Sequence, residues 1–201
     1  MAVVFIGPWC AGKSTWGKRY AQMTGQQFLD LDSIAPGYGA ELGWSVERLL
    51  RRNGEIGMLN SEREWEPVRA HIAERVLQDW SNRVIAFGAS YTGYTDSGCR
   101  RRVRDALRSH SVVLVCPSMD DAETSQVCQR RAVQSRGQEW VDQRADFDSW
   151  CPTSLDREMA DAVLMTTSGS LTFTVFTEDE FLVHDLRALC ASEEDGGENG
   201  A

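Results

Sequence analysis

Eight residues near the amino terminus, Gly7–Ser14, follow the spacing G-x-x-x-x-G-K-[ST]. The apolar, β-prone run Ala2–Ile6 precedes them, and a helix-like segment from Ser14 to about Met23 follows. This strand–loop–helix setting is the context in which the spacing marks a phosphate-binding loop. Glycines let the backbone wrap an anion, and the free amides at the start of a helix point toward it. The alternative is a glycine-rich turn that binds nothing.

The loop predicts ATP and Mg²⁺ as ligands, and each of its residues has an expected role. Lys13 is expected to lie along the β- and γ-phosphates and to stabilise charge in the transition state. Ser14 is expected to ligate Mg²⁺, and Thr15 to contact the α-phosphate. Trp9 either flanks the acceptor or packs under the loop. The residues expected to bind the nucleotide are Gly7, Pro8, Trp9, Cys10, Ala11, Gly12, Lys13, Ser14 and Thr15.

Composition restricts the class of protein. The 201 residues suit one domain with a full core. A net charge of −9 argues against a general nucleic-acid binder, and no apolar stretch approaches the ~20 residues that span a bilayer. The amino-terminal run is short and has no basic leader, so we expect no signal peptide, no membrane partner and a cytoplasmic location. The six cysteines form no C-x-x-C pair, which makes a zinc site unexpected.

Strand-like and helix-like segments alternate along the chain, which predicts an α/β fold: a parallel sheet covered by helices on both faces. Pro67 predicts a kink or restart in the third helix. We expect one domain, residues 1–191, with a lid near 130–152, and a disordered acidic tail over 192–201. The expected strands are Val3–Ile6, Gln27–Leu31, Arg83–Phe87, Ser111–Cys116 and Ala162–Met165, with Leu171–Val175 as an extra edge strand. The expected helices after the loop helix are Ser45–Arg52, Ser61–Trp80, a short basic helix with Val103 and Leu107, Asp120–Val133 and Glu178–Leu189.

Two carboxylates, Asp30 and Asp32, end the second predicted strand. Ligands of open α/β sheets bind beyond the carboxyl ends of the strands. Asp30 is therefore a candidate Mg²⁺ ligand, through water, and Asp32 a candidate base that accepts the proton of an attacking hydroxyl. The alternative reading is that these residues only form a turn or cap a helix.

With these residues in place, the sequence resembles the shikimate kinases among the small P-loop kinases. The resemblance is carried by the loop, by Asp30-x-Asp32 at the family's separation, and by several weaker matches in the family's order. It implies a P-loop NTPase fold with a five-stranded parallel sheet, and transfer of the ATP γ-phosphate to a hydroxyl of a small molecule. The weaker matches are Gly43–Val46, Leu49–Leu50, Gly54–Glu55, Glu62, Val84–Gly88 and Ala160–Asp161.

The sequence departs from the family where the substrate binds. The family has Phe-Arg where this chain has Met58 and Leu59, and that Arg grips the shikimate carboxylate. The family's glycine triplet reads Gly88-Ala89-Ser90, which we expect to contact the acceptor. The resemblance therefore implies a hydroxylated acceptor other than shikimate. Asp32-Ser33-Ile34 also resembles a segment of chloramphenicol phosphotransferases, which likewise implies that Asp32 is the base.

The family's lid sequence, R-P-L-L, is absent. Arg130, Arg131 and Arg136 lie where lid arginines occur, and Arg130 and Arg131 are the candidates to close over the phosphates and act in catalysis. Their alternative role is a solvated helix end.

Two other functions stay open. One is a nucleoside or nucleotide kinase, with a monophosphate site built from Arg51, Arg52, Arg63 and Arg69. The other is a regulator that holds ATP without transferring it. We expect a monomer or homodimer.

Overall fold

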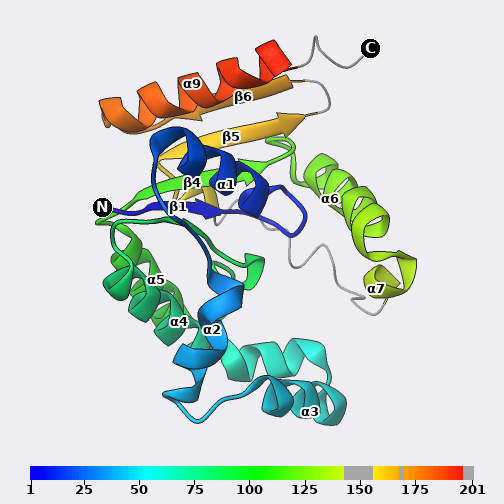
Figure 1. Cartoon of the computed structure of the whole chain (residues 1–201). Helices are drawn as coiled ribbons and strands as arrows, with labels where there is room; N and C mark the ends of the chain where they lie inside the picture. The colour runs from blue at the N-terminus through cyan, green and yellow to red at the C-terminus, as the bar shows by residue number, and fades with distance from the viewer. Residues whose placement is uncertain (143–155, 168–169, 197–201) are drawn as a thin grey trace.

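The computed structural model describes residues 1–142, 156–167 and 170–196. A six-stranded sheet forms its centre, with the strand order β2-β3-β1-β4-β5-β6 (Figure 1). The first five strands are parallel, and β6 runs antiparallel to β5. The predicted parallel sheet and its extra edge strand are therefore confirmed. The strands are β1 (Val3–Ile6), β2 (Phe28–Asp30), β3 (Val84–Ala86), β4 (Ser111–Cys116), β5 (Ala162–Thr167) and β6 (Ser170–Val175).

The central strands are apolar without interruption because both of their faces are covered. Every residue of β1 and β4 is buried. Alternate side chains enter two separate cores: Val4 and Ile6 belong to one, and Val3 and Phe5 to the other. This arrangement explains why these strands show no polar alternation in the sequence.

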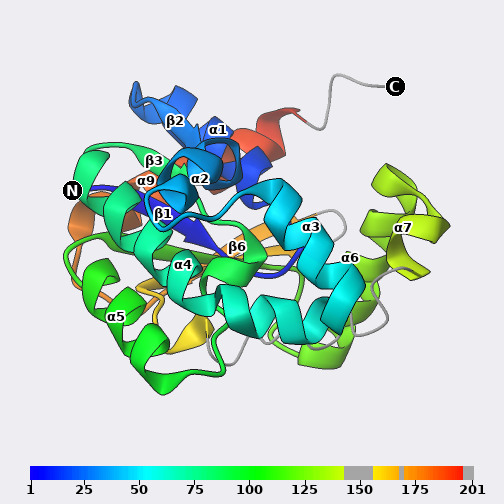
Figure 2. The same ribbon diagram turned by 90° about the horizontal axis from the view of Figure 1, so that it is seen from below.

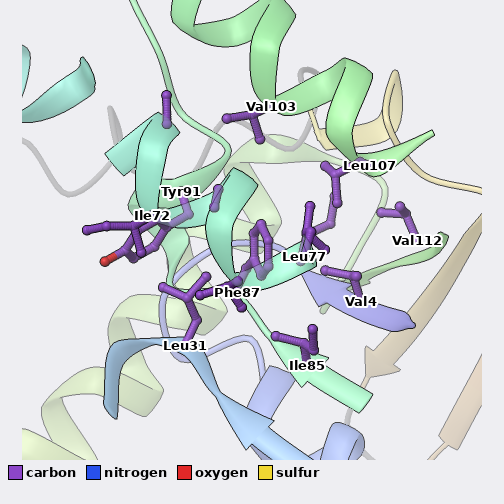
Figure 3. Close-up of a cluster of buried hydrophobic side chains, with 14 of the residues drawn as sticks. Val4, Leu31, Ile72, Leu77, Ile85, Phe87, Tyr91, Val103, Leu107 and Val112 are labelled. Atoms are coloured by element: carbon purple, nitrogen blue, oxygen red, sulfur yellow. The ribbon is translucent and has the colours of Figure 1, made fainter. Parts of the chain in front are cut away.

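Helices α1 (Lys13–Thr24), α6 (Asp121–Arg136) and α9 (Glu180–Gly196) cover one face of the sheet. Helices α2 (Leu31–Ala40), α4 (Met58–Asp79) and α5 (Ser97–Leu107) cover the other. Figure 3 shows the core that contains Val4, where side chains from α4 and α5 converge on those of β1, β3 and β4. Seen from below, α3 (Val46–Ile56) lies beside α4 at the edge of the molecule (Figure 2).

Of the two effects expected of Pro67, a kink or a restart, the restart does not occur, because α4 runs through Pro67 as one helix. Pro67 is exposed, so water can satisfy the carbonyl of Arg63, which has lost its usual helical donor. The sequence also did not predict α2. Its first residue is Leu31, which we expected to end β2, and it contains Pro36.

The expected tail also needs correction. Helix α9 continues to Gly196, so residues 192–196 are helical, and 197–201 lie outside the described residues. Glutamates favour helix, and here they extend a helix that is already packed on the sheet. Of the expected lid, α6 and α7 (Gln138–Asp142) are described, and residues 143–152 are not. Within the described parts of the chain, no helix is both long and apolar enough to cross a membrane.

Candidate active site

The loop between β1 and α1 adopts the backbone conformation that its glycines predict. Gly7 and Gly12 have φ angles of 133° and 106°, and Cys10 is the one non-glycine residue with positive φ among the described residues, at 57°. A Cβ on Gly7 would lie 2.2 Å from the carbonyl oxygen of Val115, so only glycine fits there. Gly12 directly precedes α1, which leaves the first amides of that helix free to bind an anion.

Lys13 lies inside this loop and is 8% exposed. Its Nζ donates hydrogen bonds to the carbonyl oxygens of Gly7, at 2.9 Å, and Pro8, at 2.8 Å. Burial lowers the pKa of Lys13, and the nearby carboxylates of Asp156 and Asp32 oppose that shift. The ammonium is thus held at the position where phosphate oxygens would meet it.

Asp30 joins the loop helix to the end of β2. Its Oδ2 accepts a hydrogen bond of 2.9 Å from Ser14 Oγ, and its Oδ1 accepts one of 3.2 Å from the amide of Asp32. Asp30 therefore caps α2 and also presents a carboxylate beside the Ser14 hydroxyl. Oxygen ligands of this kind are those that Mg²⁺ prefers. The described residues contain no group of three or more acidic, His or Cys side chains placed to hold a metal by themselves.

Asp32 lies in the first turn of α2 and not in the strand. Its carboxylate packs against Gly88, where a Cβ would lie 2.3 Å from Oδ1. Burial raises the pKa of Asp32, Asp30 adds to the shift, and Lys13 and Arg136 oppose it. A half-shielded carboxylate with a raised pKa beside a cation is suited to accept a proton.

A cavity of about 1360 Å³ connects these groups. The predicted site residues line it, with the exception of Gly7, Pro8 and Arg130. The short 3₁₀ helix η1 (Ala89–Tyr91) brings Ala89 and Ser90 to its wall beside Gly88. The other lining residues are Trp16, Phe87, Gln134, Ser135, Arg136, Trp140, Thr166, Leu171 and Cys190.

The arginines of α6 have different positions. Arg131 donates to the carbonyl oxygens of Ala11, at 3.2 Å, and Thr166, at 2.7 Å, so it braces the loop against the end of β5. Arg130 is exposed and lies outside the cavity, contrary to its predicted catalytic role. One residue along a helix is a rotation of ~100°, which turns Arg130 away when Arg131 faces the loop.

Arg136 lines the cavity and packs on a tryptophan, which in turn packs on a second one. Its guanidinium carbon lies 4.7 Å from the ring centroid of Trp140, and that ring lies 5.5 Å from the ring of Trp9 in the phosphate loop. Trp9 thus lines the cavity and does not pack under the loop. Sequence reasoning named Arg136 only as one of three lid candidates and did not single out Trp140.

Sequence reasoning missed Asp156 altogether. This carboxyl is 6% exposed, bonds to the side chain of Thr92 and lies near Lys13. Burial raises its pKa to about 6. It follows a polar stretch without periodicity, so no local pattern marks it.

The four arginines of the alternative nucleotide kinase reading do not converge. Arg52 pairs with Glu64 at 2.6 Å, and Arg51 lies 3.7 Å from Glu55. Arg69 is buried and bonded to backbone carbonyls, while Arg63 is exposed. None of them lines the cavity.

Comparisons with known proteins show what this chain is similar to. The family model described as Shikimate kinase matches residues 9–143. A shikimate kinase of Marinomonas sp. (strain MWYL1) is 31% identical over 113 residues, which cover 56% of this chain and 53% of that protein. One from Xanthomonas campestris pv. campestris (strain 8004) is 30% identical over 105 residues, 51% of this chain and 50% of that protein. The chain thus spans about half the length of the curated relatives it matches.

Solved structures share the fold. A shikimate kinase from Acinetobacter baumannii in complex with shikimate has a TM-score of 0.54 and 17% identity, over 96% of this chain and 94% of that one. The protein TT1252 from Thermus thermophilus has a TM-score of 0.52 and 17% identity, over 100% and 98% of the two chains. The fold, the phosphate-loop geometry and a family match over most of the chain lead to one conclusion: this chain belongs to the shikimate kinase family.

Proposed function

We propose that this chain is an ATP- and Mg²⁺-dependent kinase that phosphorylates a hydroxyl of a small molecule other than shikimate. The observation that carries the proposal is that Lys13, the Ser14–Asp30 pair and Asp32 line one cavity. Phosphoryl transfer needs a phosphate cradle, a metal ligand and an orienting base within reach of one another.

The nucleotide half of the site uses the loop and α1. The free amides at the start of α1 bind phosphate oxygens, and Lys13 exchanges its two loop carbonyls for the β- and γ-phosphates. Ser14 and Asp30 fit a magnesium ion because they place a hydroxyl and a carboxylate oxygen 2.9 Å apart. When bound there, Mg²⁺ neutralises charge on the transferred phosphoryl group.

The acceptor half uses Asp32 and the cavity wall. Asp32 accepts the hydroxyl proton as the alcohol oxygen attacks the γ-phosphorus and the bond from that phosphorus to the bridging oxygen breaks, which releases ADP. Gly88 packs against the Asp32 carboxylate. Arg136, which also lines the cavity, stabilises the charge of the moving phosphoryl group. In this proposal Arg136, and not Arg130, is the arginine that acts across the cavity.

Charge at the acceptor end argues against a carboxylate-bearing acceptor. The cations that line the cavity among the described residues are Lys13, Arg131 and Arg136. Lys13 serves the phosphates, and Arg131 is bonded to the loop and to β5. Leu59, 43% exposed, stands where the family's carboxylate-binding arginine does. A carboxylate prefers a bidentate cationic partner, and among the described residues that line the cavity no cation is left for that role.

The proposal is tested with shikimate and its methyl ester, which lacks the negative charge, within a broader screen of alcohols. Phosphate gain is read by mass spectrometry and ADP release is measured in parallel. We expect shikimate to be turned over no faster than its ester, and slower than the best acceptor. Leu59→Arg is expected to shift preference toward shikimate. If the wild-type chain turns over shikimate as fast as any other acceptor, the proposed substrate class is wrong.

The same data distinguish the proposed enzyme from the alternative, a regulator that holds ATP without transferring it. A regulator would bind Mg²⁺·ATP and release no ADP in response to any acceptor. The position of Asp32 favours the enzyme, since its carboxylate lines the same cavity as the phosphate loop and packs against Gly88.

A further inference from the structure

The segment 88–96, which joins β3 to α5, carries the cavity wall and is held from behind by two buried charged residues. These are Arg69 and Glu66 of α4, which are 2% and 3% exposed. Burying charge is costly unless the groups are paired and hydrogen-bonded, so the partners of these two side chains determine what they hold in place.

Arg69 binds the first half of the segment. Its Nη1 donates to the carbonyl oxygens of Ser90 and, at 3.1 Å, Gly93. Its guanidinium carbon lies 5.1 Å from the ring centroid of Tyr94, and its Nη2 donates to the carbonyl oxygen of Glu62 at 3.3 Å. The charge of Arg69 is therefore directed at backbone oxygens of the wall and not into the cavity.

Glu66 binds the second half. Its Oε1 accepts hydrogen bonds from the amide and the hydroxyl of Thr95, at 2.9 and 2.8 Å, and its Oε2 accepts one of 2.8 Å from the amide of Asp96. Asp96 in turn caps α5 by accepting from the amide of Cys99 at 2.7 Å. Glu66 and Arg69 also approach each other, with 3.9 Å between Oε1 and Nη2.

The segment makes few backbone hydrogen bonds of its own. The Tyr91 amide donates to the Gly88 carbonyl oxygen at 3.0 Å, which closes the turn that begins at Gly88. Beyond that turn, the carbonyls of residues 90 and 93 and the amides of 95 and 96 depend on α4. Loss of the α4 side chains would remove the protein partners of these four backbone groups.

Gly88 connects the segment that α4 holds to the proposed base, because the carboxylate of Asp32 packs against Gly88. We propose that Arg69 and Glu66 are positioning residues: they clamp the segment 88–96 so that Gly88 holds the Asp32 carboxylate in its reactive orientation. The inference rests on the proposed function, in which Asp32 takes the proton of the acceptor. A displacement of about 1 Å at such a group lowers turnover by about 10²-fold.

Hydrogen exchange on Arg69→Met tests whether Arg69 holds the segment 88–96, because this variant keeps an unbranched side chain and removes the donors. Arg63→Met is the matched control, since Arg63 lies on the same helix and is exposed. We expect amide exchange of residues 88–96 to rise at least tenfold in Arg69→Met, with the loop peptide 7–16 and the affinity for Mg²⁺·ATP unchanged. Arg69→Lys, which keeps a cationic donor, is expected to recover part of the protection.

A split between kcat and KM tests the effect on Asp32 itself. With the best acceptor from the screen, kcat should fall about 10²-fold in Arg69→Met, because the Asp32 carboxylate is displaced, while KM for Mg²⁺·ATP stays unchanged. Arg63→Met should keep both values. Glu66→Gln, which loses one of its two acceptor oxygens, should lower kcat in the same way and serves if Arg69→Met fails to fold.

Two outcomes would overturn the inference. One is unchanged exchange over residues 88–96, and the other is a uniform rise across the whole chain, which would make Arg69 an ordinary core residue. Failure of the proposed function gives a different result. In that case Asp32→Asn would hydrolyse and transfer phosphate normally, whatever the exchange data show.

Discussion

The hydroxyl of Ser14 donates a hydrogen bond of 2.9 Å to Oδ2 of Asp30, which ties the first turn of α1 to the end of β2. Two oxygens from different elements are thereby set side by side at the cavity. If they hold magnesium, Ser14→Ala should weaken the affinity for Mg²⁺·ADP at least tenfold and leave the affinity for metal-free ADP nearly unchanged. Calorimetry with and without magnesium measures both. Ser33→Ala is the control, because the Ser33 hydroxyl bonds only the exposed carbonyl oxygen of Asp30. Equal weakening in both variants would remove Ser14 from the metal site.

Gly88 and Gly93 form a matched pair for testing Asp32. A Cβ at Gly88 would lie 2.3 Å from Asp32 Oδ1, whereas one at Gly93 meets nothing within 4 Å. Gly88→Ala should therefore displace the carboxylate and lower acceptor-dependent turnover by about 10²-fold, with Mg²⁺·ATP affinity preserved. Gly93→Ala should keep both. Steady-state kinetics with the best acceptor from the screen checks this, and normal turnover by Gly88→Ala would count against Asp32 as the base.

Arg136 and Arg130 differ in their access to the cavity. Arg136→Met should lower the rate of phosphoryl transfer by about 10³-fold, as expected for an arginine that stabilises transition-state charge. Arg130→Met should change it far less, since that side chain faces away from the cavity. Single-turnover kinetics distinguishes chemistry from nucleotide release. Equal losses in the two variants would mean that α6 rotates or shifts during turnover.

Asp156 makes stability depend on pH. Its pKa is raised from 3.8 to about 6, so the folded state binds its proton more tightly than the unfolded state. The resulting stability is complete below about pH 4 and is lost as pH rises through about 6. Asp156→Asn removes the ionisation and should be more stable than the wild type near pH 7.5, by up to about 3 kcal/mol. Urea unfolding of both proteins at pH 4.5 and 7.5 measures the difference, and a constant difference at the two pH values would disprove the assignment.

Much of the fold was predictable because its signals are local. The strands β1 and β4 are continuous apolar runs that only a doubly covered sheet explains, and the loop spacing predicted the conformation of Gly7 and Gly12. Helix α2 was missed because Asp30 reads equally well as the end of a strand and as a cap, and Pro36 disfavours helix. The packing of α2 against α4 stabilises the helix despite Pro36.

Sequence spacing predicted residues that line the cavity where a motif marks them, as at Lys13, Ser14 and Asp32. The site was not predictable where tertiary contacts assign the role. Arg130 and Arg131 are adjacent in sequence and equal in charge, and only the packing of α6 against the loop separates them. Asp156 and Arg69 come from segments that carry no motif, and they reach the site only after the sheet has brought their elements together.

Lys13 keeps its ammonium bonded to two carbonyls of its own loop. A ligand must therefore replace contacts that already exist, and a single small anion offers little in exchange. Only a chain of linked phosphates, which engages the helix amides at the same time, can compensate fully. The folded loop should consequently bind free phosphate weakly and bind linked phosphates, such as those of a nucleotide, far more tightly.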